Sequence, residues 1–303
     1  MKNNLLLLFL LFTQTAFTQT EKLTKVPGTK CSLIAPDNFV TATTFSGFQH
    51  SETGASIMIN EIPAPYQTLV DGFTADTLKA RGMTLISKET IDFNNSRATL
   101  IHLFQPANGI TYIKQILIFG DSKETVLVNG IYPEASKDME VKIKDALLST
   151  VYNPLQNENP LDAATFTLDI NGTHFKLIKY MSGSLLYSTD GKIPTDKPTL
   201  IAGNSIAKVS TPHQQKYAEE RLKKLPGAAL SVIKEIKEIT IDHLKGYEIV
   251  AEGKTKNREP ELIYQVMLFN DKGGYYIIVG QAKEELQKNL EIYKQVSKTF
   301  KRR

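Results

Sequence analysis

Residues 113–121 read IKQILIFGD, and residues 263–271 read IYQVMLFND. The two stretches lie 150 positions apart, and both keep Ile, Gln, Phe and Asp at the same places. A comparison without gaps at this shift starts at Thr90, pairs Gln115 with Gln265, and ends with Gly130 on Gly280. Four predicted strands lie in this span, so the sequence predicts an internal duplication of one structural unit.

The repeated stretch is the third of these four strands. Its segment ILIF, at 116–119, is apolar at every position, which is typical of a strand that is covered on both faces. We therefore expect this strand near the middle of a sheet, with other elements packed against it.

Helices are predicted around the strands of both halves. In the first half, apolar residues at 66, 69, 70 and 73 recur at helical spacing, and Gly82 is a stop signal. In the second half, the stretch TPHQ at 211–214 has the pattern of a capping box with Thr211 as the N-cap. Each half is expected to close with a further amphipathic helix, near 136–150 and 286–300.

Asn-Gly pairs predict two-residue hairpins, because both central residues of such a turn need a positive φ. Asn108-Gly109 is expected to join the strands 97–104 and 110–119, and Asn171-Gly172 to join 166–170 and 173–178. Short hairpins imply antiparallel neighbours.

These elements predict an α+β chain of two tandem domains, each an antiparallel sheet of about six strands packed with helices as an α/β/α sandwich. We expect the boundaries to be 1–18 for a signal peptide, 22–153 for repeat 1, 154–163 for a linker with two Asn-Pro breaks, and 164–303 for repeat 2.

The first residues have the parts of a secretory signal peptide. Lys2 is followed by an unbroken apolar run at 5–12 and by the small residues of a cleavage site before Gln19. Eight apolar residues are too few for a membrane span, which needs about 20. We therefore expect an exported protein, periplasmic or secreted, with no integral membrane segment after cleavage.

Charge and cysteine content narrow the function classes. Without Lys2, the chain carries 35 Lys and Arg against 32 Asp and Glu, which is too mild a balance for a nucleic-acid-binding surface. The single cysteine, Cys31, excludes an intramolecular disulfide. We interpret Cys31 as a small buried apolar residue of the first strand, with a nucleophilic thiol as the weaker alternative.

The order of elements resembles that of the PsbP-like superfamily of α/β/α sandwiches. That superfamily includes the photosystem II extrinsic subunit, a Ran-binding nuclear import factor and many bacterial envelope proteins of unknown role. The similar features are a first strand ending in PDNF at 36–39, the helix ending at Gly82, the strand 113–121 and a closing helix to Tyr152. The resemblance covers both halves. It implies a binding or assembly module with no shared catalytic residues.

No catalytic, cofactor or metal motif stands out. The five histidines, His50, His102, His174, His213 and His243, are spread singly without metal-ligand spacing. We expect His102 to be a satisfied core histidine and His213 to be solvated at a helix start. The fragment SGS at 182–184 lacks the surroundings of a nucleophilic serine and is interpreted as a hairpin turn.

Some polar and aromatic positions carry a weaker functional alternative. The shift of 150 matches Asp121 with Asp271 and Asp92 with Asp242, which we interpret as turn formers rather than paired functional carboxylates. The sequon NGT at 171–173 is more simply a hairpin turn. Core packing is the first interpretation of the tyrosines, and a groove for a glycan or peptide is the alternative. These tyrosines are Tyr180, Tyr187, Tyr275 and Tyr276.

The sequence therefore favours a non-catalytic, exported module that binds another envelope component, without a cofactor, a metal or nucleic acid. Two alternatives stay open. One is a small-ligand carrier with an apolar pocket inside a sandwich. The other is a hydrolase with a site between the domains, formed by residues that are distant in sequence.

Overall fold

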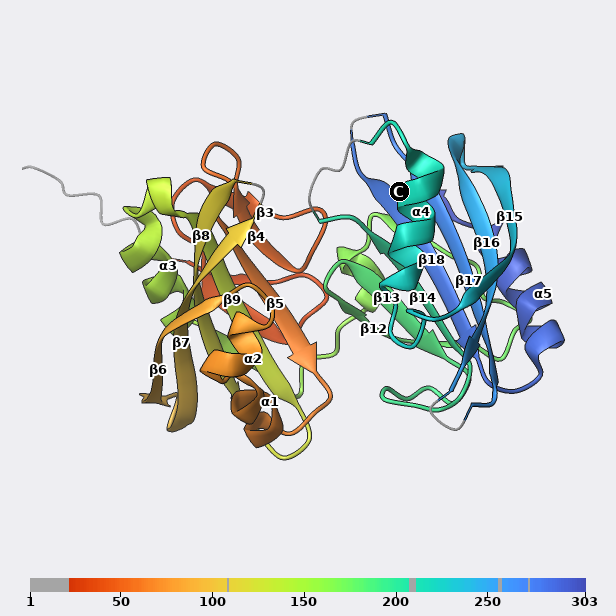
Figure 1. Ribbon diagram of the computed structural model, residues 1–303. Coiled ribbons are helices and arrows are strands. Elements are labelled where there is room, and N and C mark those ends of the chain that lie inside the picture. Colours follow the sequence, from red (N-terminus) through yellow and green to blue (C-terminus); the bar gives the residue numbers. More distant parts are fainter. Residues whose placement is uncertain (1–21, 108, 207–210, 256–257, 272) are drawn as a thin grey trace, which may run out of the picture.

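The computed structural model describes residues 22–107, 109–206, 211–255, 258–271 and 273–303. In this part of the chain, two antiparallel sheets of seven strands lie next to each other (Figure 1). The predicted antiparallel sheets with packed helices are confirmed, but each sheet contains one strand more than the six expected. The expected signal peptide, 1–18, and Asn108 of the expected hairpin turn lie outside the described residues.

The first half has a main sheet with the strand order β3-β4-β5-β9-β8-β7-β6 and a small sheet with the order β1-β2-β10. The strands are β1 (Leu23–Lys25), β2 (Cys31–Ile34), β3 (Phe39–Thr41), β4 (Gly47–His50), β5 (Ser56–Ile62), β6 (Thr84–Phe93), β7 (Ser96–Ala107), β8 (Ile110–Gly120), β9 (Thr125–Pro133) and β10 (Val151–Tyr152). The helices are α1 (Tyr66–Gly72), α2 (Ala75–Lys79), the 3-10 helix η1 (Glu134–Ser136) and α3 (Met139–Leu148).

The second half repeats this arrangement with the strand order β12-β13-β14-β18-β17-β16-β15 and a separate pair β11-β19. The strands are β11 (Phe166–Thr167), β12 (Lys176–Met181), β13 (Ser184–Ser188), β14 (Thr199–Asn204), β15 (Val232–Ile241), β16 (Leu244–Lys254), β17 (Pro260–Phe269), β18 (Tyr275–Ala282) and β19 (Lys301–Arg302). The helices are the 3-10 helix η2 (Pro160–Ala163), α4 (Gln214–Lys223) and α5 (Leu286–Ser297).

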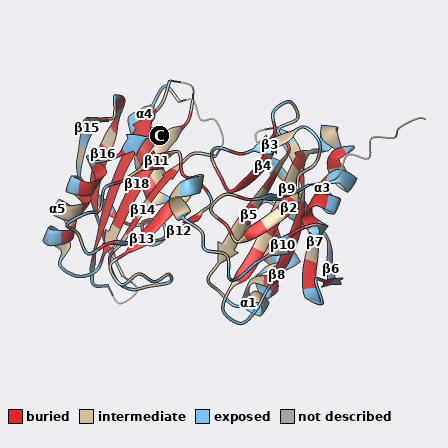
Figure 2. Cartoon of the chain, turned by 180° about the vertical axis from the view of Figure 1, so that it is seen from behind, coloured by how far each residue is buried: buried red, intermediate tan, exposed pale blue. Residues whose placement is uncertain are grey.

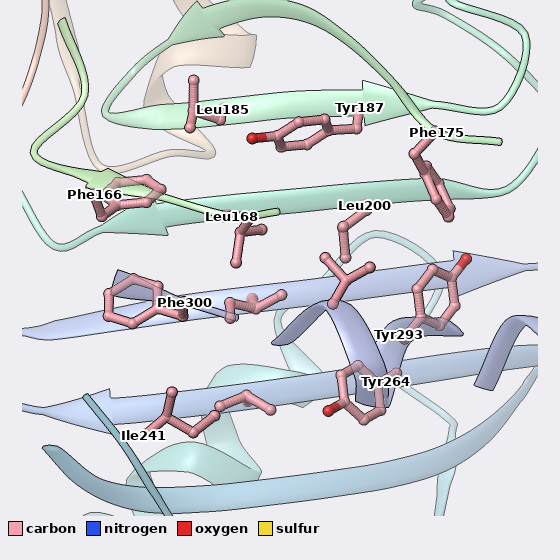
Figure 3. Close-up of a cluster of buried hydrophobic side chains, with 14 of the residues drawn as sticks. Phe166, Leu168, Phe175, Leu185, Tyr187, Leu200, Ile241, Tyr264, Tyr293 and Phe300 are labelled. Carbon is pink, nitrogen blue, oxygen red and sulfur yellow. The ribbon is translucent and has the colours of Figure 1, made fainter. Parts of the chain in front are cut away.

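Helices cover both faces of each main sheet, so the repeated strand is buried on both sides as predicted. Leu117 of β8 packs in the cluster that holds α3, whereas its neighbour Ile116 packs with α1 and α2 on the opposite face. Figure 2 shows the buried residues running along the central strands of both halves. Figure 3 shows the larger cluster of the second half, where Tyr293 of α5 stacks on Tyr264 of β17 with 5.9 Å between ring centroids.

The duplication is real in strand order, but the comparison without gaps is wrong by one residue at the repeated strand. Gly130 lies opposite Gln115 in β8, whereas Gly280 lies opposite Tyr264 in β17. Gln115 therefore corresponds to Tyr264 and not to Gln265. The cause is the following turn, which spans 121–124 in the first half and 270–274 in the second. Because side chains alternate along a strand, a shift of one residue exchanges the two faces.

The same analysis separates the matched aspartates. The turn between β6 and β7 consists of Asn94 and Asn95, and the turn between β15 and β16 consists of Asp242 and His243, all with positive φ. Asp242 therefore corresponds to Asn94, and the match of Asp92 with Asp242 is wrong. The longer turn after β17 likewise removes the match between Asp121 and Asp271.

Three local predictions about helices and turns are also wrong. The helix expected from residue 66 is divided into α1 and α2, and Thr74 caps α2 by accepting a hydrogen bond from the N–H of Thr77 (3.2 Å). Helix α4 begins at Gln214 with His213 as N-cap, because Thr211 instead accepts a hydrogen bond from the N–H of His213. The turn at 171–172 is not a hairpin, since β11 pairs with β19 at the chain end.

The two halves contact each other through a hairpin of the second half. The turn between β12 and β13 consists of Ser182 and Gly183, which confirms the hairpin predicted for the SGS fragment. The backbone N–H and the Oγ of Ser182 both donate to Oδ1 of Asn60 in β5, at 3.1 and 2.8 Å. Asn204 of β14 donates to the carbonyl of Thr44 at 3.2 Å.

Candidate functional site

A pocket of about 600 Å³ lies at one end of the first-half sheet, where β10 passes the turns that follow β6 and β8. We call it the first-half pocket. It is lined by Lys30, Phe93, Asn94, Ser96, Arg97, Phe119, Gly120, Asp121, Lys123, Glu124, Val126, Val151, Tyr152 and Pro154. Its volume is typical of ligand sites in proteins, which range over about 300–1,000 Å³.

The floor of this pocket is aromatic and apolar. Phe93 ends β6 and Phe119 lies near the end of β8, and their ring centroids are 4.9 Å apart. Tyr152 of β10 meets Phe119 edge to face at 6.3 Å, and Val126 of β9 is buried beside them. The hairpin geometry of the sheet brings these four side chains together, so an apolar group that enters the pocket would replace water on a rigid surface.

The rim carries two exposed cations, Arg97 and Lys123, that form no salt bridge with the described residues. Asp121 is also at the rim, but its Oδ1 accepts the backbone N–H groups of Lys123 and Glu124 at 2.7 and 2.9 Å. Asp121 is therefore a turn former, as predicted, but its charge still acts on Lys123, and Asp92 lies directly opposite Arg97 in the β6–β7 pair. The pocket lining carries three cations, Lys30, Arg97 and Lys123, against the carboxylates of Asp121 and Glu124, so it is positive by one charge and favours an anionic group.

Glu124 is the centre of a polar cluster on the inner wall. Its Oε2 accepts hydrogen bonds from Tyr152 Oη at 2.7 Å and from Lys30 Nζ at 3.0 Å. Burial by itself raises the pKa of Glu124, but the bonds from Tyr152 and Lys30 and the charge of Lys179 lower its pKa overall. Burial, and then the bond to Glu124, raise the pKa of Tyr152. Near neutral pH, the carboxylate is ionised and the phenol keeps its proton.

The cluster extends across to the second half. Lys179 of β12 lies 3.4 Å from Oε1 of Glu124, and its Nζ donates to the carbonyl of Glu61 at 2.6 Å. Glu61 in turn accepts the backbone N–H of Lys30 at 2.5 Å. The inner wall of the first-half pocket is therefore also a connection between the halves.

Cys31 does not take part in this chemistry. It is fully buried in β2, as predicted. Burial, with a further contribution from the charge of Glu61, raises the pKa of its thiol. A thiol without a lowered pKa is a poor nucleophile, so the weaker interpretation of Cys31 as a nucleophile receives no support.

The structure does not gather the histidines into a site. His50 is buried and packs edge to face on Phe39, and His102 is half-buried on β7. Within the described residues, Nε2 of His102 has no hydrogen-bond partner, so His102 is not the satisfied core histidine that was expected. His213 is exposed at a helix start, as expected. No group of His, Cys, Asp or Glu in the described part of the chain has the arrangement of a metal site.

The tyrosines divide into two groups. Tyr180 and Tyr187 are buried in the core of the second half, and burial raises the pKa of each to about 12. Core packing is thus confirmed for these two. Tyr275 and Tyr276 are half-buried and line a second pocket, together with Asp271.

Comparisons with known proteins concern the fold alone. No family model matches the sequence, and the search of curated proteins gave no match. Similar solved structures include LpqN, involved in cell envelope biogenesis of Mycobacterium tuberculosis (17% identity, 49% of this chain, 88% of that chain, TM-score 0.33). A cyanobacterial PsbP from Synechocystis has 11% identity and a TM-score of 0.29, with 50% of this chain and 100% of that chain covered.

A third similar structure spans both halves. It is the immunity protein TplEi of the T6SS from Pseudomonas aeruginosa, complexed with "L" peptide (12% identity, 94% of this chain, 99% of that chain, TM-score 0.33).

Sequence reasoning missed the residues of the first-half pocket. Lys30, Glu61 and Glu124 lie in three separate segments, and no spacing rule connects them. Lys179 comes from the other half. The one available signal was Asp121, which marked the turn that carries Lys123 and Glu124 but was interpreted only as a turn.

Proposed function

We propose that this chain is an exported, non-catalytic module of two PsbP-like α/β/α sandwiches, and that its first-half pocket binds an acidic, apolar-anchored segment of another envelope protein. The observation that carries this proposal is the pairing of a rigid aromatic floor with two exposed cations, Arg97 and Lys123, that form no salt bridge with the described residues.

The pocket selects its ligand by two properties. The floor of Phe93, Phe119 and Val126 favours an aromatic or branched apolar side chain, which loses contact with water when it enters. The rim of Arg97 and Lys123 favours carboxylates next to that anchor. An apolar anchor surrounded by charge complementarity is the usual composition of a protein-binding hot spot.

The state of the inner wall supports a role without catalysis. A general base needs a pKa near the working pH, but Glu124 is held ionised and Tyr152 protonated. Lys30 is placed beside Glu124 at 3.0 Å and beside Tyr152 at 3.4 Å. These contacts support a fixed framework rather than a proton-transfer site in this pocket.

Export and the place of binding rest on separate observations. The apolar run at 5–12 behind Lys2 supports export. No helix in the described ranges is long and apolar enough to cross a membrane. The carrier alternative requires a closed apolar pocket inside a sandwich, whereas the first-half pocket lies at the end of the sheet with an exposed, charged rim.

Site-specific photo-crosslinking in the native cells tests the proposal. A photoreactive residue in place of Ser96, at the rim, should give one dominant protein adduct, and the same residue in place of Glu219 on α4 should not. The purified partner should bind at least about tenfold more weakly to the double variant R97E/K123E, because two attractive charges become repulsive.

The control is K216E, which makes one charge reversal of the same kind at an exposed position of α4. It should leave the affinity unchanged. Equal adducts at both crosslinking positions, or equal affinity of R97E/K123E and the unaltered chain, would reject the first-half pocket as the binding site.

A further inference from the structure

A second pocket, also of about 600 Å³, lies between the two halves. We call it the second-half pocket. Polar side chains of both halves line it, namely Thr43, Thr44 and Gln49 from the first half and Asn204, Ser205 and Tyr276 from the second.

This pocket occupies the position in the second half that the first-half pocket occupies in the first. Tyr276 of β18 lies opposite Leu268, as Val126 of β9 lies opposite Phe119. Arg302 of the closing strand β19 pairs with Phe166, as Tyr152 of β10 pairs with Cys31. The fold therefore leaves a hollow at the same end of both sheets, where the closing strand meets the turn before the last strand.

Among the lining residues that the structure describes, the cation of the second-half pocket is Arg302, and it is paired. Its Arg302 donates from Nε to Oδ2 of Asp242 at 2.6 Å and from Nη2 to the carbonyl of Asp242 at 2.8 Å. The hydrogen bonds and the charge of Arg302 lower the pKa of Asp242, so this pair stays ionised and neutral in sum. The remaining charged residue of the wall, Asp271, disfavours an anion.

The other polar groups are hydroxyls and carboxamides. Two of them are partly used within the protein, because Nδ2 of Asn204 donates to the carbonyls of Thr44 and Ser205, and Oγ of Ser205 accepts the N–H of Tyr275. Such groups both donate and accept hydrogen bonds, so they match a ligand whose groups do the same. Tyr276 has a fixed position, because its ring packs on Phe300 at 5.0 Å and on Phe166 at 5.9 Å. Its hydroxyl makes no hydrogen bond with the described residues and is available at the pocket.

We propose that the second-half pocket binds a neutral oligosaccharide through hydroxyl and carboxamide groups of both halves. Sugar hydroxyls donate and accept at the same atom, which suits this wall better than a peptide does, because a bound peptide would require side-chain pockets or a free strand edge. The volume lies within the usual range for a small ligand.

Calorimetric titration of the full mature chain tests this proposal with five defined probes. Three are neutral (maltotetraose, cellotetraose and chitotetraose), and two are acidic (a galacturonic acid tetramer and a heparin tetrasaccharide). At least one neutral probe should bind, and the acidic probes should not. The variants T43V and Y276F should each weaken binding about 2- to 10-fold, the range for the loss of one neutral hydrogen bond.

Two control variants remove the same kinds of hydroxyl group at positions outside the second-half pocket. T84V, at an exposed position of β6, and Y112F, on β8, should leave the affinity unchanged. The variant R97E/K123E should also bind the neutral probe normally, which separates this proposal from the one for the first-half pocket. Binding of the acidic probes alone, binding of no probe, or unchanged affinity in both T43V and Y276F would overturn the proposal.

Discussion

The two pockets occupy the same place in the two repeats but present opposite chemistry. In the first half, Lys30 and Tyr152 stand at the closing strand, beside the ionised Glu124. Lys30 precedes Cys31 as Thr165 precedes Phe166, so the second half has Thr165 and Arg302 at these two positions. The duplication has kept the hollow, which follows from strand order, while the side chains that face it have diverged.

If both proposals hold, the two repeats are not two sites for one ligand. Strand topology makes the cavity, because the closing strand must cross the end of the sheet in both halves. Recognition depends on single residues of the wall and can change without affecting the sheet. The first-half pocket has two cations without a salt bridge, whereas the described charges of the other wall are Asp271 and Arg302, which is paired with Asp242. This contrast is the reason that we propose two ligands of different charge.

The strongest effects are expected at the glycines that face the closing helices, Gly280 below α5 and Gly130 below α3. A Cβ at Gly280 would lie 2.5–2.7 Å from ring atoms of the fully buried Tyr293, which cannot move aside. At Gly130 it would lie 2.2 Å from Cγ2 of Ile143, which is equally buried, but the next atom is 3.2 Å away, so fewer atoms must move. We expect G280A to lower the free energy of unfolding by about 3 kcal/mol and G130A by about 1 kcal/mol.

Urea denaturation of both variants measures this difference. The control is G72A, because no atom lies within 4 Å of a Cβ at Gly72, at the end of α1. It should change stability by less than about 1 kcal/mol. Equal losses of unfolding free energy for G280A and G130A would show that the two closing helices pack equally tightly on their sheets.

Much of the fold could be predicted from local patterns. The apolar segment at 116–119, the turn-forming SGS fragment and the helical spacing at 286–300 each depend on neighbours in sequence, and the structure has a buried strand, a hairpin and a helix there. The register of the repeat could not be predicted, because the identities Gln115/Gln265 and Phe119/Phe269 fit a shift that the longer turn at 270–274 removes.

The candidate site was less accessible to sequence reasoning than the fold. Phe93, Phe119 and Val126 alternate like ordinary core residues, and only the hairpin ends place them around a hollow. Glu124 and Lys179 are ordinary surface residue types until the two halves are brought together. Contacts between distant segments depend on tertiary packing, for which spacing along the chain contains no signal.

A smaller effect on stability is expected from Glu124, which connects the two halves through its contact with Lys179. Its pKa is lower than the ordinary 4.5, so its contribution to stability is present above pH 4.5 and is lost as the pH falls through the folded-state pKa. We expect E124Q to lose about 1–3 kcal/mol at neutral pH, the usual range for hydrogen bonds to a charged group. The variant should also lose less further stability than the unaltered chain on acidification to about pH 4.

In the same cluster, the pKa of Glu61 is shifted in the opposite direction to that of Glu124. Burial, its main influence, raises its pKa, so the folded chain disfavours its ionised form and acidification offsets this cost. E61Q should therefore lose stability more steeply on acidification than the unaltered chain does. Urea unfolding at several pH values measures both slopes, with the exposed E89Q on β6 as control. Parallel slopes for E124Q and E61Q would contradict the assignment of opposite pKa shifts.

The smallest effects on stability are expected at two equivalent turns, which hold the chain next to β10 and at β19. Asn94 donates from Nδ2 to the carbonyl of Thr150 at 3.0 Å, and Asp242 at the equivalent position pairs with Arg302 at 2.6 Å. N94G keeps the positive φ but loses a neutral hydrogen bond, so it should cost about 1 kcal/mol. D242N removes a partly exposed ion pair and should cost about 0.5 kcal/mol.

Salt separates these two turns, because screening weakens an ion pair but not a neutral hydrogen bond. The cost of D242N should therefore shrink at about 1 M salt, while the cost of N94G should stay the same. Urea unfolding at low and high salt compares them within one experiment. If both costs respond equally, the two closing segments are held by the same kind of interaction, and the chemical divergence of the repeats is confined to the pocket walls.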